Sequence, residues 1–307
     1  MARIALKVDV DTLRGTVEGV PRLLDMLARR DVRATFLFSV GPDHTGWALR
    51  RVFRRGFLSK VSRTSVVRHY GLRTLAYGVL LPGPDIGRRG ADPMRACRDL
   101  GHECGLHAWD HVYWQDHVRT RDEHWTRTQM QRGHARFTEV FGRPPDTHGA
   151  AGWQANAHAF AQIDDWGMTH ASDGRGSAPY RLQINGRVCS HIQLPTTLPT
   201  FDELIGVDGI DEHTVDQALL SHTTQDVDQV FTLHAELEGA LLAPAFERLI
   251  DGWRAQGHQL TSVAAIAATL DPTALAVRPL AWASVAGRSG ELIVEPPTQR
   301  SAGSTAL

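Results

Sequence analysis

The sequence predicts an α/β protein whose strands form a mostly parallel sheet or a barrel. Apolar segments of strand length alternate with segments of helical periodicity over about 270 of the 307 residues. Acidic and histidine residues follow the ends of several predicted strands, where parallel α/β proteins place their chemistry. Hydrophobic residues make up 42% and charged residues 22% of the chain, a balance typical of a globular domain.

The N-terminal elements are predicted by the spacing of apolar residues. Residues 4–10 carry an apolar residue at every second position, which predicts a strand, and Asp9 and Asp11 share its other face. A helix is expected from about Val20, because Pro21 suits a first turn and apolar residues recur three and four apart. Residues 34–40 predict a second strand.

Capping residues predict the elements of the middle of the chain. Asp92 and Pro93 predict a helix start, and Gly101 its end. A short strand over 103–106 is then expected to lead to His107. A long helix is expected from about 122 to 141.

The remaining elements continue the alternation. Asn156 is expected to cap a helix that ends at Gly167, and residues 230–237 alternate as a strand. Two late helices follow, the second of them rich in alanine. No internal repeat interrupts the pattern.

These elements predict one catalytic domain over residues 1–285, with a basic amphipathic insertion at about 43–90. Residues 286–307 are rich in Gly, Pro, Ser and Thr without periodicity, so we expect a disordered tail. The first residues have the alternating apolar pattern of a strand, and we recognise no signal peptide in them. No apolar run approaches the roughly 20 residues of a membrane span. Three cysteines form no paired framework, which favours a reducing compartment.

The insertion has an unusual local charge. Residues 47–81 contain eight Lys or Arg and no Asp or Glu, interleaved with large apolar residues. This pattern predicts contact with an anionic membrane surface, where each charge contributes about 1 kcal/mol. A solvated helical insertion that packs on the body by its apolar face is the alternative. The net charge of −1 and the lack of a recognisable module argue against nucleic acid as a partner.

Four residues predict a metal centre. His107 and His111 are four apart, so on a helical turn they share one face and can bind one ion. Asp9 and Asp11 would repel each other unless a cation lies nearby. Three ligands, an open position for water and a separate base are the requirements of a mononuclear metal hydrolase.

The same motifs resemble those of the polysaccharide deacetylases (carbohydrate esterase family four). The likeness is carried by Asp-Val-Asp at 9–11, the string at 101–111 and Thr-Leu-His at 232–234. Longer strings, at 8–24, 38–43, 150–153, 172–176, 194–200 and 232–239, resemble a branch that removes formate from 4-deoxy-4-formamido-L-arabinose carried on undecaprenyl phosphate. The likeness covers roughly residues 3–285.

The resemblance implies a distorted (β/α) barrel and one divalent metal ion. It also implies hydrolysis of the formamide of a polyprenyl-phosphate-linked sugar, for lipid A modification and polymyxin resistance. That reaction takes place at the cytoplasmic face of the bacterial inner membrane, on a peripheral protein. N-deacetylation of another glycan or glycolipid is the alternative, and the oligomeric state stays open.

Residue roles follow from the same resemblance. Asp11, His107 and His111 are the expected metal ligands; Zn²⁺ suits them best, with Mn²⁺, Co²⁺ and Ni²⁺ open. Asp9 is the expected general base, and a second metal ligand or a salt-bridge carboxylate is its alternative role. His234 is the expected general acid for the departing amine. Asp173 is expected to hold the His234 ring in one tautomer.

The expected substrate contacts lie in two loops. A backbone N–H of Ala151 or Gly152 is expected to bind the oxyanion. Trp153 forms either a wall of the sugar pocket or part of the core, and Arg175 is a candidate sugar contact. Many family members use an Arg in the third motif to orient the base, but residues 145–153 contain none. Arg14 and Arg175 are the candidates for that task.

Overall fold

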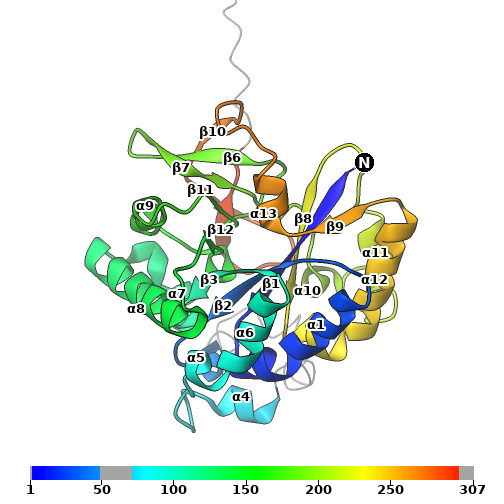
Figure 1. The fold of residues 1–307 in the computed structure, drawn as a ribbon, viewed down its shortest axis with the longest axis horizontal. Helices are drawn as coiled ribbons and strands as arrows, with labels where there is room; N and C mark the ends of the chain where they lie inside the picture. Colours follow the sequence, from blue (N-terminus) through cyan, green and yellow to red (C-terminus); the bar gives the residue numbers. More distant parts are fainter. Residues whose placement is uncertain (1, 49–70, 297–307) are drawn as a thin grey trace, which may run out of the picture.

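The computed structural model describes residues 2–48 and 71–296 (Figure 1). A ten-stranded sheet forms its centre, in the order β10-β6-β7-β5-β4-β3-β2-β1-β8, and β9 also pairs with β1. The strands are β1 (Arg3–Val10), β2 (Thr35–Ser39), β3 (Glu103–Ala108), β4 (Thr147–His148), β5 (His170–Ala171), β6 (Tyr180–Ile184), β7 (Arg187–Gln193), β8 (Gln229–His234), β9 (Gln259–Thr261) and β10 (Val277–Pro279).

The sheet is parallel from β7 through β5 to β8, and β6 is antiparallel to β7. The irregular chain after β7 bridges the two edges of the parallel part. The Leu194 N–H donates to Ala171 in β5, whereas the N–H groups of Thr197 and Leu198 donate to Val230 in β8. This bridge makes the predicted barrel a distorted one, and the α/β class is confirmed.

Helices cover the outside of the sheet (Figure 1). They are α1 (Val20–Ala28), α4 (Leu72–Ala76), α5 (Ile86–Arg89), α6 (Ala91–Asp99), α7 (His111–His117), α8 (Glu123–Phe141), α9 (Ala157–Asp165), α10 (Phe201–Leu204), α11 (Val215–Leu220), α12 (Ala243–Ala255) and α13 (Val263–Ala267). The apolar face of β1, with Ile4, Leu6, Val8 and Val10 fully buried, belongs to the main core. That core fixes which face of β1 carries the polar residues.

Several predicted helix ends are confirmed. The Asp122 side chain caps α8 by accepting from the Trp125 N–H, and Asn156 caps α9 in the same way. Gly142 ends α8 with a φ of 72°, a conformation that suits glycine. The predicted start at Asp92 is wrong by two residues, because Gly90 precedes the first residue of α6.

Two predicted strand ends are also corrected. Strand β3 continues through His107 to Ala108 instead of stopping at 106. Strand β8 ends at His234, and the π-helical turn η5 (Leu237–Leu241) follows where the strand was expected to continue. Both differences lie at the carboxyl edge of the sheet, where the chain turns to present the polar residues.

The expected disordered tail is wrong for residues 286–296. Strands β11 (Ala281–Ser284) and β12 (Glu291–Val294) form an antiparallel hairpin. The Ile293 side chain is 1% exposed, and its carbonyl accepts from the Arg175 N–H at 2.9 Å. Residues 291–294 are too few for a period to be recognised in the sequence, and their packing against the barrel orders them. Residues 297–307 lie outside the described residues.

The basic insertion is described only in part. Its residues 49–70 lie outside the described residues, whereas 71–90 form α4, α5 and the turns between them. Within the described ranges, no helix is both long and apolar enough to cross a membrane.

We expect the hairpin to contribute to the stability of the whole domain. Truncating a buried Ile to Ala costs about 2–5 kcal/mol, so Ile293→Ala is expected to lower the free energy of unfolding by that amount. Val277→Ala in β10, where the side chain is 42% exposed, is the matched control and is expected to cost under about 1 kcal/mol. Urea unfolding measures both; equal midpoints for the two variants would contradict the packing role of the hairpin.

Candidate active site

Three predicted ligands meet at the carboxyl edge of the sheet. Asp11 follows β1, His107 lies in β3, and His111 is the first residue of α7. The Nε2 atoms of His107 and His111 lie 3.2 and 3.4 Å from the two carboxylate oxygens of Asp11. The expected shared helix face is wrong: a strand-to-helix turn, not a helix, brings the two rings to a centroid distance of 5.3 Å.

Hydrogen bonds to neighbouring residues orient the side chains of His107 and His111 toward Asp11. Nδ1 of His107 lies 2.6 Å from the carbonyl of Gly149, which directs Nε2 toward Asp11. Asp110 caps α7 by accepting from the Tyr113 N–H and so fixes the helix that carries His111.

The donor set fits a divalent cation. Oδ1 of Asp11 is buried and accepts no hydrogen bond from the described residues. Although burial opposes it, the neighbouring His111, His107 and His234 hold the pKa of Asp11 far below its usual range. One carboxylate oxygen and two imidazole nitrogens, clustered in this way, could hold Zn²⁺ or a similar ion.

Asp9 is oriented by a residue that the sequence analysis missed. Nζ of Lys7 lies 3.3 Å from Oδ2 of Asp9, and the Lys7 side chain is fully buried. Lys7 and Asp9 share the polar face of β1, because they are two residues apart on a strand. Arg14 instead pairs with Glu18, and Arg175 with Glu203. The period of two that placed Asp9 beside Asp11 was the signal that could have identified Lys7.

Trp153 lies under a group of cations. Its ring is 3% exposed, and Lys7, Arg175 and Arg288 approach it at 5.4, 5.1 and 4.7 Å from the centroid. Its indole N–H donates to Thr196. The burial of Trp153 favours its role as part of the core. Its alternative role, as a wall of the sugar pocket, stays a prediction.

The predicted oxyanion residues form the tight turn η4 (Ala151–Trp153), beside α7. Gly152 has a φ of 60°, and a Cβ there would lie 2.3 Å from Nε2 of Gln115. A side chain at this position would therefore strain the backbone and displace the end of the Gln115 side chain. Ala151 is buried. The oxyanion role of the two N–H groups, like the sugar contact expected of Arg175, stays a prediction.

His234 lies beside Asp9. It ends β8 at the position in register with Asp9 on β1. Burial lowers the pKa of its imidazole, but Asp202, Asp11 and Asp9 together outweigh burial and raise it. A raised pKa keeps a proton on the ring, as a general acid requires.

The predicted partner of His234 is wrong. Asp173 lies 2.6 Å from Nδ1 of His148, and its other oxygen accepts from Gln193. These bonds hold Asp173 inside the barrel. Asp202, in α10, has the largest charge effect on the pKa of His234. No motif or spacing identifies Asp202, because the chain between β7 and α11 is irregular.

Two glutamates after β8 fix the loops that carry the site. One oxygen of Glu236 accepts from the N–H groups of Asp11 and Thr12, and Glu238 accepts from the His234 N–H. Burial, with Asp11 nearby, raises the pKa of Glu236 to about 8. A Cβ at Gly15 would lie 1.9 Å from the Glu236 carboxylate, so glycine leaves the space this bonding requires.

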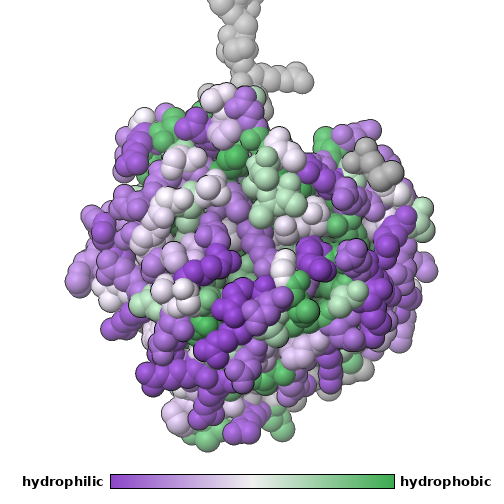
Figure 2. Space-filling view, viewed as in Figure 1, coloured by the Kyte–Doolittle hydropathy of each residue, from purple (hydrophilic) through white to green (hydrophobic). Residues whose placement is uncertain are grey.

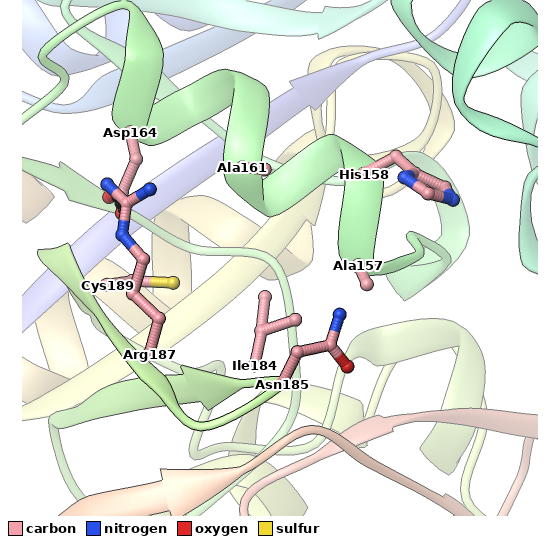
Figure 3. Close-up of a pocket in the computed structure, with 8 residues that line it drawn as sticks. All are labelled: Ala157, His158, Ala161, Asp164, Ile184, Asn185, Arg187 and Cys189. Carbon is pink, nitrogen blue, oxygen red and sulfur yellow. Dashed lines mark ion pairs between the residues drawn. The ribbon is translucent and has the colours of Figure 1, made fainter.

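A second cluster of donors lies away from this site. Asp164, Cys189 and His191 gather where α9 meets β7. Asp164 and Cys189 lie at one end of a cavity of about 210 Å³ (Figure 3). Oδ1 of Asp164 already accepts from the Ser190 N–H and hydroxyl and lies 2.6 Å from Nδ1 of His191. The cluster therefore serves to join the helix to the strand.

Comparisons with known proteins agree with this geometry. The polysaccharide deacetylase family model matches residues 3–171. A protein of Shewanella sediminis, described as a 4-deoxy-4-formamido-L-arabinose-phosphoundecaprenol deformylase (ArnD), is 37% identical over 81% of each chain. A protein of the same description from Wigglesworthia glossinidia brevipalpis is 30% identical over 77% of this chain and 83% of its own.

The fold agrees with a solved structure as well. A Mycobacterium smegmatis protein described as a polysaccharide deacetylase superposes with a TM-score of 0.63 at 19% identity, over 92% of this chain and 95% of its own. Together, the matched motifs, the barrel and the Asp-His-His cluster lead to one conclusion. The chain belongs to the polysaccharide deacetylase family.

Proposed function

We propose that this chain is a metal-dependent deformylase. Its substrate is 4-deoxy-4-formamido-L-arabinose linked to undecaprenyl phosphate, and its products are formate and the free amino sugar lipid. One observation carries the proposal: Asp11, His107 and His111 converge on one point, with Asp9 and His234 side by side on the neighbouring strands. The relatives described as deformylases support the choice of substrate.

Asp11, His107 and His111 would hold the divalent ion. When bound, such an ion polarises the formyl oxygen and lowers the pKa of water from about 15.7 towards 7. Zn²⁺ suits one carboxylate and two imidazoles, and Mn²⁺, Co²⁺ and Ni²⁺ are compatible with the same donors.

Asp9 and His234 divide the proton transfers. Oδ1 of Asp9 is buried without a hydrogen-bond partner among the described residues, while Lys7 holds Oδ2. Oδ1 is therefore the oxygen that takes a proton from the attacking water. His234, whose raised pKa keeps it charged, gives a proton to the sugar nitrogen as the C–N bond breaks. Water and formamide thus become formic acid and an amine. Formic acid then ionises to formate, and the site is restored when Asp9 releases its proton to solvent and His234 takes one up.

The lipid substrate calls for a membrane-facing surface. Around α4, Leu72, Val79, Leu80 and Leu81 are 75%, 53%, 83% and 43% exposed. Figure 2 shows a mainly hydrophilic face with hydrophobic residues at the edge where Figure 1 places α4. Arg73, Arg88 and Arg89 lie in the same part of the chain. We infer that this edge contacts anionic headgroups at the cytoplasmic face of the inner membrane, in the pathway of lipid A modification.

Purified protein is expected to release formate from the formamido-sugar lipid and to leave the acetyl analogue unchanged. Mass spectrometry of the lipid after incubation measures both reactions, since loss of formyl and loss of acetyl differ in mass. Asp11→Asn is the control for the metal centre, and chelation is expected to abolish turnover that added Zn²⁺ restores. Selective loss of acetyl would establish the alternative, an N-deacetylase.

Lys7→Met is expected to lower kcat by about 10²–10⁴-fold, the contribution of a general base. The apolar side chain would leave the Asp9 carboxylate buried without its cation and free to turn. Lys7→Arg keeps the charge and is expected to retain more activity than Lys7→Met. Steady-state kinetics with circular dichroism as a folding check measures the series. Full activity in Lys7→Met would show that another group orients Asp9.

The double variant Leu72→Ser/Leu80→Ser is expected to weaken binding to anionic vesicles at least about tenfold, because two exposed leucines lose their apolar contact. Val227→Ser/Val277→Ser removes exposed apolar side chains from the turn before β8 and from β10, and this variant is expected to bind as the native protein does. Cosedimentation with vesicles compares the two variants. Equal binding would rule out α4 and its flanking turn as the contact surface.

A further inference from the structure

The loop after β2 lies against the segment that joins the two histidine ligands. The N–H groups of Val40 and Gly41 donate to the carbonyls of Ala108 and Trp109 at 3.0 and 2.7 Å. This segment runs directly from the first histidine ligand to the second, so these bonds fix the backbone between them. The loop belongs to one of the strings that carry the family resemblance, yet none of its side chains has a task in the proposed chemistry.

Asp43 joins the same loop to the chain after Asp11. Its Oδ2 accepts from the Leu13 N–H at 2.9 Å, and its Oδ1 accepts from the N–H and the hydroxyl of Thr45 at 3.1 and 2.6 Å. The Asp43 side chain is buried. Because Leu13 is two residues after Asp11, this carboxylate ties the chain that presents the first ligand to the loop after β2.

His44, the next residue, joins the loop to the helix that presents His111. Its Nδ1 lies 2.6 Å from Oδ2 of Asp110, and the ring donates because a carboxylate only accepts hydrogen bonds. The other oxygen of Asp110 accepts from the Tyr113 N–H at 3.1 Å and so caps α7. His111 directly follows Asp110, so the His44 ring fixes the turn from which this ligand projects.

The His44 ring is itself held in place. It stacks on the Trp47 ring at a centroid distance of 3.9 Å and an interplanar angle of 17°. The Trp47 indole N–H donates to the Gly78 carbonyl at 2.6 Å. Trp47 belongs to the short helix η2 (Thr45–Ala48), which contacts both α7 and α4. A ring confined in this way can hold Asp110 at one place.

We propose that His44 is a positioning residue for the metal centre: it holds Asp110, and with it the turn that carries His111, at a fixed place relative to Asp11. Asp43, its neighbour in the chain, anchors the same loop on the Asp11 side. The inference rests on the metal centre of the proposed function. His44 is not a member of the cluster of ligand atoms, so it acts through Asp110 and does not bind the ion itself.

Titration of the metal-free, full-length protein with Co²⁺ tests this placement. His44→Ala is expected to weaken Co²⁺ binding about 10- to 100-fold, the usual loss when a partner that orients a ligand is removed. The visible absorption bands of bound Co²⁺, which report the geometry of its ligands, are expected to change as well. The His44 side chain is 20% exposed, so we expect the variant to fold, and circular dichroism checks this.

Two further replacements of His44 separate its hydrogen bond from its bulk. His44→Asn is expected to bind Co²⁺ nearly as tightly as the native protein does, because the amide nitrogen of Asn takes the place of Nδ1 and can donate to Asp110. The amide nitrogen of Gln lies one bond further along the side chain, so His44→Gln is expected to resemble His44→Ala. Equal weakening by Asn and Gln would overturn the proposal, because the bond to Asp110 would then not be what matters.

His117→Ala is the matched control. His117 lies at the end of α7, where its Nδ1 is 2.9 Å from the Tyr113 carbonyl and its ring packs on the Tyr113 ring at 4.7 Å. None of its bonds within the described part of the chain involves Asp110, so this variant is expected to bind Co²⁺ with native affinity and spectrum. Equal losses in His117→Ala and His44→Ala would overturn the proposal and leave both residues as general supports of α7.

A double-mutant cycle tests the route through Asp110. In the Asp110→Ala background, His44→Ala is expected to change the Kd for Co²⁺ by less than about twofold, because the carboxylate through which it acts is gone. Additive losses would overturn this route. An unchanged Kd and an unchanged spectrum in the single variant His44→Ala would overturn the proposal outright.

The native protein separates these outcomes from a failure of the proposed function. If the native chain binds neither Co²⁺ nor Zn²⁺, the metal-dependent assignment fails. If it binds Co²⁺ and His44→Ala binds it equally well, only the role of His44 is refuted. If the native chain binds Co²⁺ but the Zn²⁺-loaded protein releases no formate, the deformylase assignment fails while the effect of His44 on the metal centre still stands.

Discussion

The buried ion pair between Lys7 and Asp9 is the constraint on which the rest of the site depends. Both side chains project from the polar face of β1, and the Lys7 side chain has no exposed surface. Neither charge can be removed alone without leaving the other uncompensated in the interior, which costs several kcal/mol. Strand β1 must therefore keep its register between β2 and β8, and that register also places Asp9 beside His234 and presents Asp11 at the sheet edge.

Around this pair, the site alternates positive and negative groups. Asp9 pairs with Lys7, Asp11 lies between the imidazoles of His107 and His111, and the charges of Asp202, Asp11 and Asp9 act on His234. The arrangement lowers the pKa of Asp11 and raises that of His234, so that Asp11 stays ionised while His234 retains a proton. Two titratable groups of one site can thus hold opposite charges, because different neighbours act on each.

The C-terminal part of the chain completes a site whose motifs lie mostly in the N-terminal half. The segment after β7 closes the barrel against β8, and the β11–β12 hairpin covers residues 174–176. Arg175 and Arg288 both lie over the Trp153 ring and share Glu203, so they link η4, which carries Ala151, to α10, which carries Asp202. A site built on the carboxyl ends of parallel strands needs such support, because the strands themselves end there.

The sequence alone determined the class of fold, the main helices and strands, and the identity of the cluster of Asp11, His107 and His111, because periodicity and capping are local properties and the metal motifs are short strings. The four-residue spacing predicted that His107 and His111 share a helical turn, whereas a strand-to-helix turn joins them. The tertiary structure decided what spacing cannot encode: that Lys7 holds Asp9, that Asp173 belongs to His148, and that the last hairpin reaches Asp202. These pairs join residues of different elements or depend on burial, and only the folded chain sets which side chains meet and how much water remains around them.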